Sequence, residues 1–368
     1  MSSTGRVATG LSHGRRADPK HAEDAVRRAL ERAELERASA VMLFLTPEYA
    51  GNPEPALRAA ARAAGTLQVV GATAAGILTE EEWVLDSPGA AAMVFGPPFT
   101  LGIPTRQWDD ENVVLSLCTP AGMGADWLDA PLQRIGAISG DLSGDGPFKV
   151  WAPGRVSESG CAQARIDGAE AVLTVSQGVH ALTAPIEVAE VQGYDLKRLG
   201  NYPALAVLVQ SLPGAVQEME RVPLHMLMGG VTFGDPHTAI QDGRYRLNHI
   251  LAANVREQSI TLANPLVRGE RLFWAMRDAL TAERDMSATL ERASAELKGA
   301  PDFAWLFPCM GRGPHFFGNR DRDLDILRAR FPGMPVIGMY GNGEIGPLDG
   351  LNHLYQYSAV VGLFRAKN

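Results

Sequence analysis

Short runs of apolar residues alternate with stretches of helical spacing at the N-terminal end of the chain. Residues 40–45 form a continuous apolar run and residues 68–71 a shorter one, a pattern typical of strands that are buried on both faces. Asp18-Pro19 predicts a capped helix that ends near Ala38, and Asn52-Pro53 predicts a second helix through Ala64. Residues 6–12 and 90–95 complete this block as two further predicted strands.

The C-terminal end repeats this order. Residues 303–307, 336–338 and 358–364 are predicted strands, and residues 321–331 are a predicted helix with one apolar face. Gly71 and Gly76 are separated by the same distance along the chain as Gly338 and Gly343. We therefore expect two copies of one α/β unit, one at each end of the chain.

The middle of the chain is richer in strands and turns. Residues 135–144 and 225–235 each predict a strand that runs into a Gly-Asp turn, and residues 171–178 predict another strand. Residues 197–210 are predicted to hold a short helix that joins the two halves, and residues 286–297 are a predicted helix. This arrangement favours an α/β fold of layered α+β sheets over a doubly wound sheet, with two pseudo-repeated halves packed together.

Composition limits the class of protein. The chain has 368 residues, which suits two domains, and a net charge of -8, which gives no general attraction to nucleic acid or anionic lipid. Its three cysteines are widely spaced and form neither a disulfide framework nor a zinc motif. We expect a cytoplasmic protein without a membrane-spanning segment, because no long apolar run is present.

A glycine-rich loop with one carboxylate, Glu344, is the main candidate for chemistry. Residues 335–347 run from a short apolar strand into this loop, but they lack the Gly-x-Gly-x-x-Gly pattern and a following helix. Glu344 either contacts a ligand or caps the loop. Cys309, three residues before Arg312, is either a small buried apolar residue or a thiol whose pKa the arginine lowers.

Several segments together resemble the FIST family (F-box and intracellular signal transduction proteins). Residues 306–312, 335–347 and 273–279 are similar to the C-terminal half of the family, and residues 10–12, 41–44, 70–76 and 175–178 to the N-terminal half. The resemblance implies a FIST N-type domain over residues 1–200 and a FIST C-type domain over residues 201–368. Ile77 stands where the family often has an acidic residue, which leaves the Glu344 loop as the better candidate site.

The resemblance implies a bacterial-type sensory protein that binds a small ligand, such as an amino acid or a related polar metabolite, and passes the signal to a kinase or cyclase. No catalytic residue and no metal site is assigned, and a binding protein is favoured over an enzyme. The predicted ligand-binding residues are Cys309, Arg312, Gly338, Gly341, Asn342, Gly343 and Glu344.

Three other functions stay open. Some members of the family resemble haem-binding nitric oxide sensors, for which His180, His225 and His249 are candidate axial ligands here. A cysteine-dependent enzyme would use Cys309. A protein-interaction scaffold would use the glycine loops only as turns.

Overall fold

The computed structural model describes residues 6–104, 113–124, 126–129, 132–141, 143–219, 222–348 and 350–367. The chain divides into two compact units, of which the first combines Met1–Ser176 with Met286–Asn368 and the second is Gln177–Asp285. The predicted domain boundary at residue 200 follows the family resemblance and stays a prediction. No helix among the described residues is both long and apolar enough to cross a bilayer.

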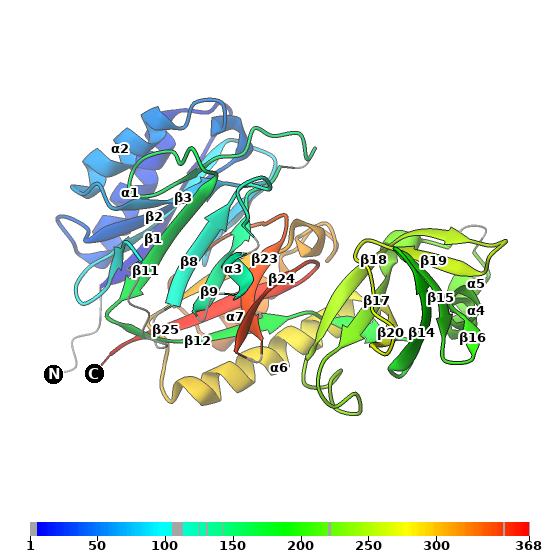
Figure 1. Cartoon of the computed structure of the whole chain (residues 1–368). Coiled ribbons are helices and arrows are strands. Elements are labelled where there is room, and N and C mark those ends of the chain that lie inside the picture. Colours follow the sequence, from blue (N-terminus) through cyan, green and yellow to red (C-terminus); the bar gives the residue numbers. More distant parts are fainter. Residues whose placement is uncertain are drawn as a thin grey trace. The chain divides into compact units, whose positions relative to one another are not determined.

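The N-terminal block of the first unit is a sheet with strand order β1-β6-β2-β3, and two helices cover its outer face (Figure 1). Its elements are β1 (Val7–His13), α1 (Pro19–Ala33), β2 (Ala40–Leu45), α2 (Glu54–Ala64), β3 (Val69–Thr73) and β6 (Gly89–Phe95). The Asp18 side chain caps α1 through the Lys20 N–H at 2.8 Å. The predicted end of this helix near Ala38 is wrong, because Glu34 adopts a left-handed conformation (φ 52°) and closes the helix there.

The C-terminal block has the same strand order, β12-β25-β21-β22. Its elements are β12 (Ala169–Ser176), α6 (Ala279–Leu297), β21 (Phe303–Pro308), α7 (Arg322–Arg330), β22 (Val336–Met339) and β25 (Ala359–Ala366). Counted in chain order, the second and third strands of each block are parallel (β2 with β3, and β21 with β22). The other neighbouring strands are antiparallel. The fold class and the two repeated end units predicted from sequence are therefore confirmed.

A third copy lies between these two and was not predicted. Its strands are β7 (Thr100–Gly102), β8 (Val113–Cys118), β9 (Gln133–Ile138) and β11 (Cys161–Asp167). Their order in the sheet is β7-β11-β8-β9, with β8 and β9 parallel, which matches the other two blocks strand by strand. The described helix within it is the short α3 (Asp126–Asp129), so the described part of the repeat lacks the helical pattern that marks the others. We call the three copies repeats A, B and C in chain order.

In each repeat, the strand that follows the third strand along the chain pairs with the sheet of another repeat. β4 (Ile77–Thr79) of repeat A pairs with β22, β10 (Val150–Trp151) of repeat B pairs with β3, and β23 (Glu344–Leu348) of repeat C pairs with β9. The hairpin partners β5 (Trp83–Val84) and β24 (Leu351–Tyr355) follow β4 and β23. The three sheets are thus linked in a closed cycle of exchanged strands.

A glycine occupies the same place in the third strand of every repeat. Gly71, Gly136 and Gly338 each pair with a residue of the second strand, and a Cβ on any of them would meet that residue's carbonyl oxygen at 1.7, 1.9 and 1.8 Å respectively. Only glycine permits this close approach of two backbones. The repeated position therefore has a steric cause.

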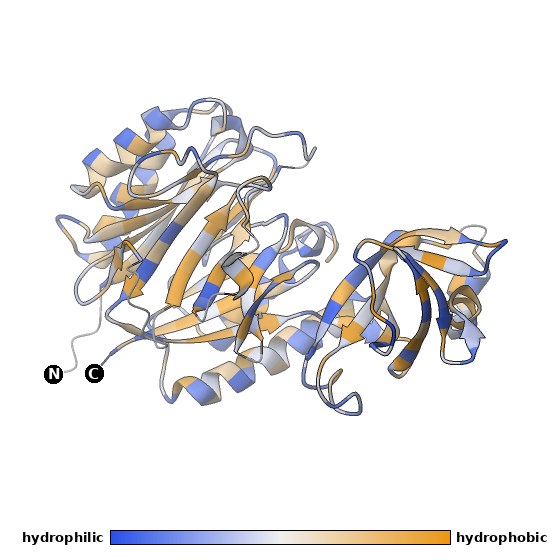
Figure 2. Cartoon of the chain, in the orientation of Figure 1, coloured by the Kyte–Doolittle hydropathy of each residue, from blue (hydrophilic) through white to orange (hydrophobic). Residues whose placement is uncertain are grey.

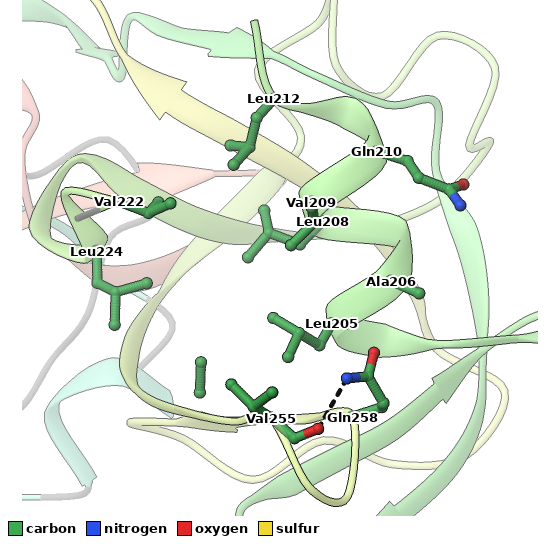
Figure 3. Close-up of a pocket in the computed structure, with 11 residues that line it drawn as sticks. Leu205, Ala206, Leu208, Val209, Gln210, Leu212, Val222, Leu224, Val255 and Gln258 are labelled. Atoms are coloured by element: carbon green, nitrogen blue, oxygen red, sulfur yellow. Dashed lines mark hydrogen bonds between the residues drawn. The ribbon is translucent and has the colours of Figure 1, made fainter. Parts of the chain in front are cut away.

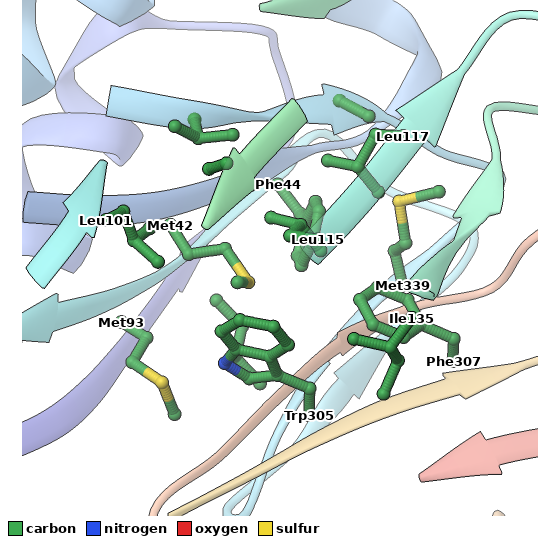
Figure 4. Close-up of a cluster of buried hydrophobic side chains, with 14 of the residues drawn as sticks. Met42, Phe44, Met93, Leu101, Leu115, Leu117, Ile135, Trp305, Phe307 and Met339 are labelled. Carbon is green, nitrogen blue, oxygen red and sulfur yellow. The ribbon is translucent and has the colours of Figure 1, made fainter. Parts of the chain in front are cut away.

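The main core of the first unit lies between the three sheets. Phe44, Leu117 and Phe307 occupy equivalent positions in the second strands and meet there, together with Met42, Leu115 and Trp305 from the same strands (Figure 4). Figure 2 shows apolar residues concentrated on the strands, while the outward faces of α1 and α2 are polar. Two smaller cores join α1 and α2 to the sheet of repeat A, and α6 and α7 to the sheet of repeat C.

The second unit is inserted between β12 and α6 of repeat C. Strands β17, β18, β19, β15, β14 and β20 pair in this order, and β20 pairs back with β17, so the antiparallel sheet closes into a barrel. The elements of this unit are β13 (Val179–Ala181), β14 (Ile186–Gln192), β15 (Asp195–Leu199), β16 (Tyr202–Pro203), α4 (Ala204–Ser211), α5 (Gly214–Gln217), β17 (Leu227–Thr232), β18 (Tyr245–Asn254), β19 (Ser259–Leu262) and β20 (Arg271–Arg277). The short helix predicted within residues 197–210 is α4, which begins at Ala204, after β15 has completed its hairpin with β14.

Candidate functional site

Glu344 is completely buried at the start of β23. Its Oε2 accepts a hydrogen bond from the Ser358 hydroxyl at 3.0 Å. Its Oε1 has no hydrogen-bond partner of normal geometry among the described residues. A Cβ at Gly341 would lie 3.2 Å from Oε1, so this glycine keeps the space beside the carboxyl group open.

Cys309 lies next to Glu344 and is also buried. Its backbone N–H donates to the Ser358 carbonyl at 2.8 Å, and its side chain is 7% exposed. Burial, with the neighbouring Glu344 charge, raises the pKa of the Cys309 thiol, and burial also raises the pKa of Glu344 well above its usual value. Both groups are therefore held in their neutral forms, and Cys309 is not an activated thiolate in this conformation.

Cys309 and Ser358 of this polar cluster have counterparts in the other two repeats. In the other repeats the N–H of Thr46 donates to the Gly89 carbonyl at 3.1 Å, and that of Thr119 to the Gly160 carbonyl at 2.8 Å, as Cys309 does to Ser358. Strand register aligns Cys309 with the two threonines and Ser358 with the two glycines.

Spacing from the shared glycines aligns Glu344 with the apolar Ile77 of repeat A. The backbone frame is thus common to the repeats, whereas repeat A has a buried apolar residue where repeat C has the buried acid.

Arg312 takes part in a different network. It donates to both oxygens of Asp323 at 2.9 Å, to the Ser176 carbonyl at 2.9 Å and to the Ser176 hydroxyl at 2.7 Å. All three residues are buried. Arg312 therefore ties the start of α7 to the end of β12, the point where the chain leaves repeat C for the barrel.

A second carboxylate, Asp321, lies beside this network. It caps α7 through the Leu324 N–H at 2.8 Å and accepts a hydrogen bond from the Tyr340 hydroxyl. Burial and the nearby charge of Asp323 raise the pKa of Asp321 to about 6.

The remaining predicted residues follow the backbone of the exchanged strand. Gly343 accepts from the Ile138 N–H at 2.8 Å, and Asn342 donates its N–H to the Ile138 carbonyl at 2.9 Å, while the Asn342 side chain is exposed. Gly338 is the third-strand glycine of repeat C. The structure thus brings Cys309, Gly341 and Glu344 together and directs Arg312 to Asp323; whether any of them contacts a ligand stays a prediction.

A cavity of about 720 Å³ lies in the second unit, beside α4 (Figure 3). Its wall combines the apolar side of α4, the segment around Val222 and Leu224, and the tip of the β18–β19 hairpin. Its described lining residues are Leu205, Ala206, Leu208, Val209, Gln210, Leu212, Val222, Leu224, Ala253, Val255 and Gln258.

Sequence reasoning missed this cavity. One available signal was that the short helix α4 is apolar nearly all round. Such a helix is usually buried, whereas its Val209 is 46% exposed. The volume falls within the usual range for small-molecule sites, about 300–1,000 Å³.

The candidate haem ligands lie in the second unit but do not line this cavity. His180 on β13 and His225 are exposed, and His249 lies on β18 opposite Met228. The described lining contains no His, Cys, Met or Tyr, the side chains that ligate haem iron. Among the described residues no three His, Cys, Asp or Glu side chains gather to hold a metal ion. The described lining of the cavity therefore does not fit haem.

The fold and the cavity define a three-repeat sheet protein that carries a barrel with a ligand-sized site. Residues 204–347 match the FIST C domain family. These residues therefore form a FIST C domain, and the resemblance to the FIST family is confirmed over this part of the chain. FIST domains are associated with signal transduction and small-ligand sensing.

Proteins of bacterial and human origin are similar in sequence to parts of this chain. An uncharacterized protein of Mycobacterium tuberculosis is 31% identical over 250 residues, which is 67% of this chain and 65% of the relative. One of Mycobacterium bovis is 29% identical over 248 residues, 67% of this chain and 64% of the relative. The chain thus covers less than two thirds of these relatives. Human F-box only protein 22 is 29% identical over 73 residues, 19% of this chain and 18% of that protein.

Proposed function

We propose that this chain is an intracellular sensory protein that binds a small ligand in the barrel cavity and acts in signal transduction. The observation that carries the proposal is the position of the cavity. Every described lining residue, from Leu205 to Gln258, falls within the segment that matches the FIST C domain. The part of the chain with the family assignment is therefore the part that offers a site of ligand size.

Local hydrogen bonds support a preformed site. The Leu205 N–H at the start of α4 donates to the Gln258 carbonyl at 3.1 Å, which joins two walls of the cavity. The Asn254 side chain accepts from the N–H groups of Arg256 and Glu257, each at 3.1 Å, and fixes the hairpin tip. At the other end of α4, the Gln217 amide donates to the Leu212 carbonyl at 2.8 Å. Walls held in this way lower the entropy cost of ligand binding.

The buried cluster around Glu344 is the second place where a ligand could act. Its support is the unpartnered Oε1 atom beside Gly341. An amino acid or related metabolite that used this cluster would need a conformational opening, because Glu344 and Cys309 are buried. We also propose that a kinase or cyclase is the partner that receives the signal from the ligand-bound protein.

A thermal-shift screen of amino acids, organic acids and uncharged metabolites tests the function. Each compound is measured with the wild type, with Val209→Asp in the cavity wall and with Glu344→Gln in the buried cluster. A compound that raises the melting temperature of the wild type and of Glu344→Gln, but not of Val209→Asp, supports the barrel site. Loss of the shift only in Glu344→Gln would move the ligand to the buried cluster. A screen without any stabilising compound would overturn small-ligand sensing.

A further inference from the structure

We infer that the ligand of the barrel cavity is an uncharged, mostly apolar small molecule with a hydrogen-bonding group, rather than an amino acid. This inference rests on the proposed function, namely that the cavity is the ligand site. It is carried by the chemistry of the wall, by the cavity volume and by the exposed apolar side chains that line it.

The described wall offers no charge. Nine of the eleven lining residues are Leu, Val or Ala, and the other two are Gln210 and Gln258. An amino acid carries an ammonium and a carboxylate, and each would lose water without gaining an opposite charge from these residues. Removing an ion from water without a partner costs far more than an apolar wall returns. The lining therefore disfavours zwitterions and favours neutral ligands.

Gln258 defines where the polar group of the ligand lies, since the Gln210 side chain points away from the cavity in Figure 3. Gln258 stands at the hairpin tip with a left-handed backbone (φ 54°), and its carbonyl is bonded to the Leu205 N–H. Its side-chain amide donates to the Val255 carbonyl at 2.8 Å, which holds the side chain at the wall (Figure 3). A carboxamide has a second donor hydrogen and an acceptor oxygen, so it matches a hydroxyl or carbonyl group on the ligand.

Size and exposure agree with an apolar ligand larger than one amino acid. The cavity of about 720 Å³ lies in the range that holds drug-sized molecules. Val209 and Val255 line it while being 46% and 74% exposed. A bound apolar molecule would remove these side chains from water, which is the usual driving force for such sites.

Nile red, a neutral apolar dye, is the probe for the test. The full chain, freed of co-purified lipid by passage over a hydrophobic resin, is titrated with the dye and the fluorescence increase is measured. We expect saturable binding with one dye per chain and at least a tenfold loss of affinity in Val255→Asp. The matched control is Val267→Asp, because Val267 is 67% exposed, lies in the same unit and is not among the lining residues. This control should bind as the wild type does, and both variants should keep the wild-type melting temperature.

The possible outcomes distinguish an error in the proposed class of ligand from an error in the proposed sensory function. Displacement of the dye by uncharged apolar metabolites, but not by amino acids at millimolar concentration, supports the inference. Tight binding of an amino acid that Val255→Asp abolishes would overturn the ligand class and leave the sensory function intact. Equal binding of the dye to the wild type and Val255→Asp would overturn the cavity as the site. A concentration-dependent dimer that Val255→Asp dissociates would assign the apolar wall to an interface and overturn both proposals.

Discussion

The guanidinium of Arg312 and the carboxylate of Asp323 form a buried ion pair with two hydrogen bonds of 2.9 Å. Arg312 also donates hydrogen bonds to the carbonyl and hydroxyl of Ser176, at the end of the strand from which the chain leaves for the barrel. Asp323 also lies in the first turn of α7, where the helix dipole favours a negative charge. Arg312 is therefore placed to hold three segments of repeat C together.

Arg312→Met should destabilise the protein strongly. It leaves the Asp323 carboxylate buried without its cation, which typically costs about 3–5 kcal/mol. Urea unfolding followed by circular dichroism measures the change. The control is Arg322→Met, which removes an exposed pair with Asp325 at 3.4 Å and should cost at most about 1 kcal/mol. A loss below about 1 kcal/mol for Arg312→Met would contradict the structural role.

The Asp321 carboxyl should make stability depend on pH. Its folded pKa, raised by burial to about 6, lies above the unfolded value near 3.8, so the native state binds the proton more tightly. The free energy of unfolding should therefore fall as pH rises from about 4 to about 6, by up to about 3 kcal/mol.

Asp321→Asn should flatten this part of the stability profile, since an amide does not titrate and can still cap α7. Unfolding in urea at pH 4, 5, 6 and 7 gives both profiles. Asp325→Asn controls for the loss of a negative charge on the same helix. Parallel profiles for the wild type and Asp321→Asn would refute the assignment.

Glu344→Gln should preserve stability, whereas Glu344→Ala should not. Burial raises the pKa of Glu344, so the folded protein holds the neutral acid, which glutamine resembles in shape and charge. Alanine leaves Ser358 without its acceptor and opens a cavity, which costs about 1–3 kcal/mol.

The sign of the pH effect gives a second check on Glu344. The stability that the neutral Glu344 contributes is present at low pH and is lost as pH rises through its raised pKa. The melting temperature of Glu344→Gln relative to that of the wild type should therefore increase toward alkaline pH. Melting temperatures at pH 5 and pH 8 test this. Equal losses for glutamine and alanine at both pH values would show that the ionised carboxylate is the form the fold requires.

Gly71→Ala and Gly338→Ala should each cost about 3 kcal/mol or more. The added methyl group would meet the Leu43 or Leu306 carbonyl at 1.7 or 1.8 Å, so two buried strands must separate. Gly51→Ala is the control, because a methyl group added there would meet nothing within 4 Å. Chemical unfolding compares the three variants, and a change below about 1 kcal/mol for both strand glycines would reject the close-packed pairing.

The sequence predicts the end repeats because their signal is local. Continuous apolar runs, helix caps and the paired glycines of repeats A and C are each readable within a short window. Repeat B has the same strand order, but β7 is only three residues long and no long helix of repeat B is described. Its third-strand glycine, Gly136, follows Ile135 as Gly338 follows Ile337, and this was the available sign.

The candidate site was harder to predict because its parts come from distant segments. Pairing of β21 with β25 brings Cys309 and Ser358 together, and Glu344 reaches them from β23, which pairs with β9 in another sheet. Only Cys309 and Glu344 were singled out from sequence. The barrel cavity depends on closure of the sheet by β17 and β20 and on the placement of α4 beside the β18–β19 hairpin. Neither contact leaves a periodic pattern in the sequence.

The cycle of exchanged strands has a consequence for the history of this fold. In the first unit, β4, β10 and β23 each complete the sheet of another repeat, as arms do between the subunits of a ring-shaped trimer. The first unit therefore has the connectivity of a strand-swapped homotrimer whose three subunits have been fused into one chain. Because the three repeats share one chain, they need not be identical: repeat C carries the buried acid and the inserted barrel, whereas repeat A has Ile77 at the position of Glu344.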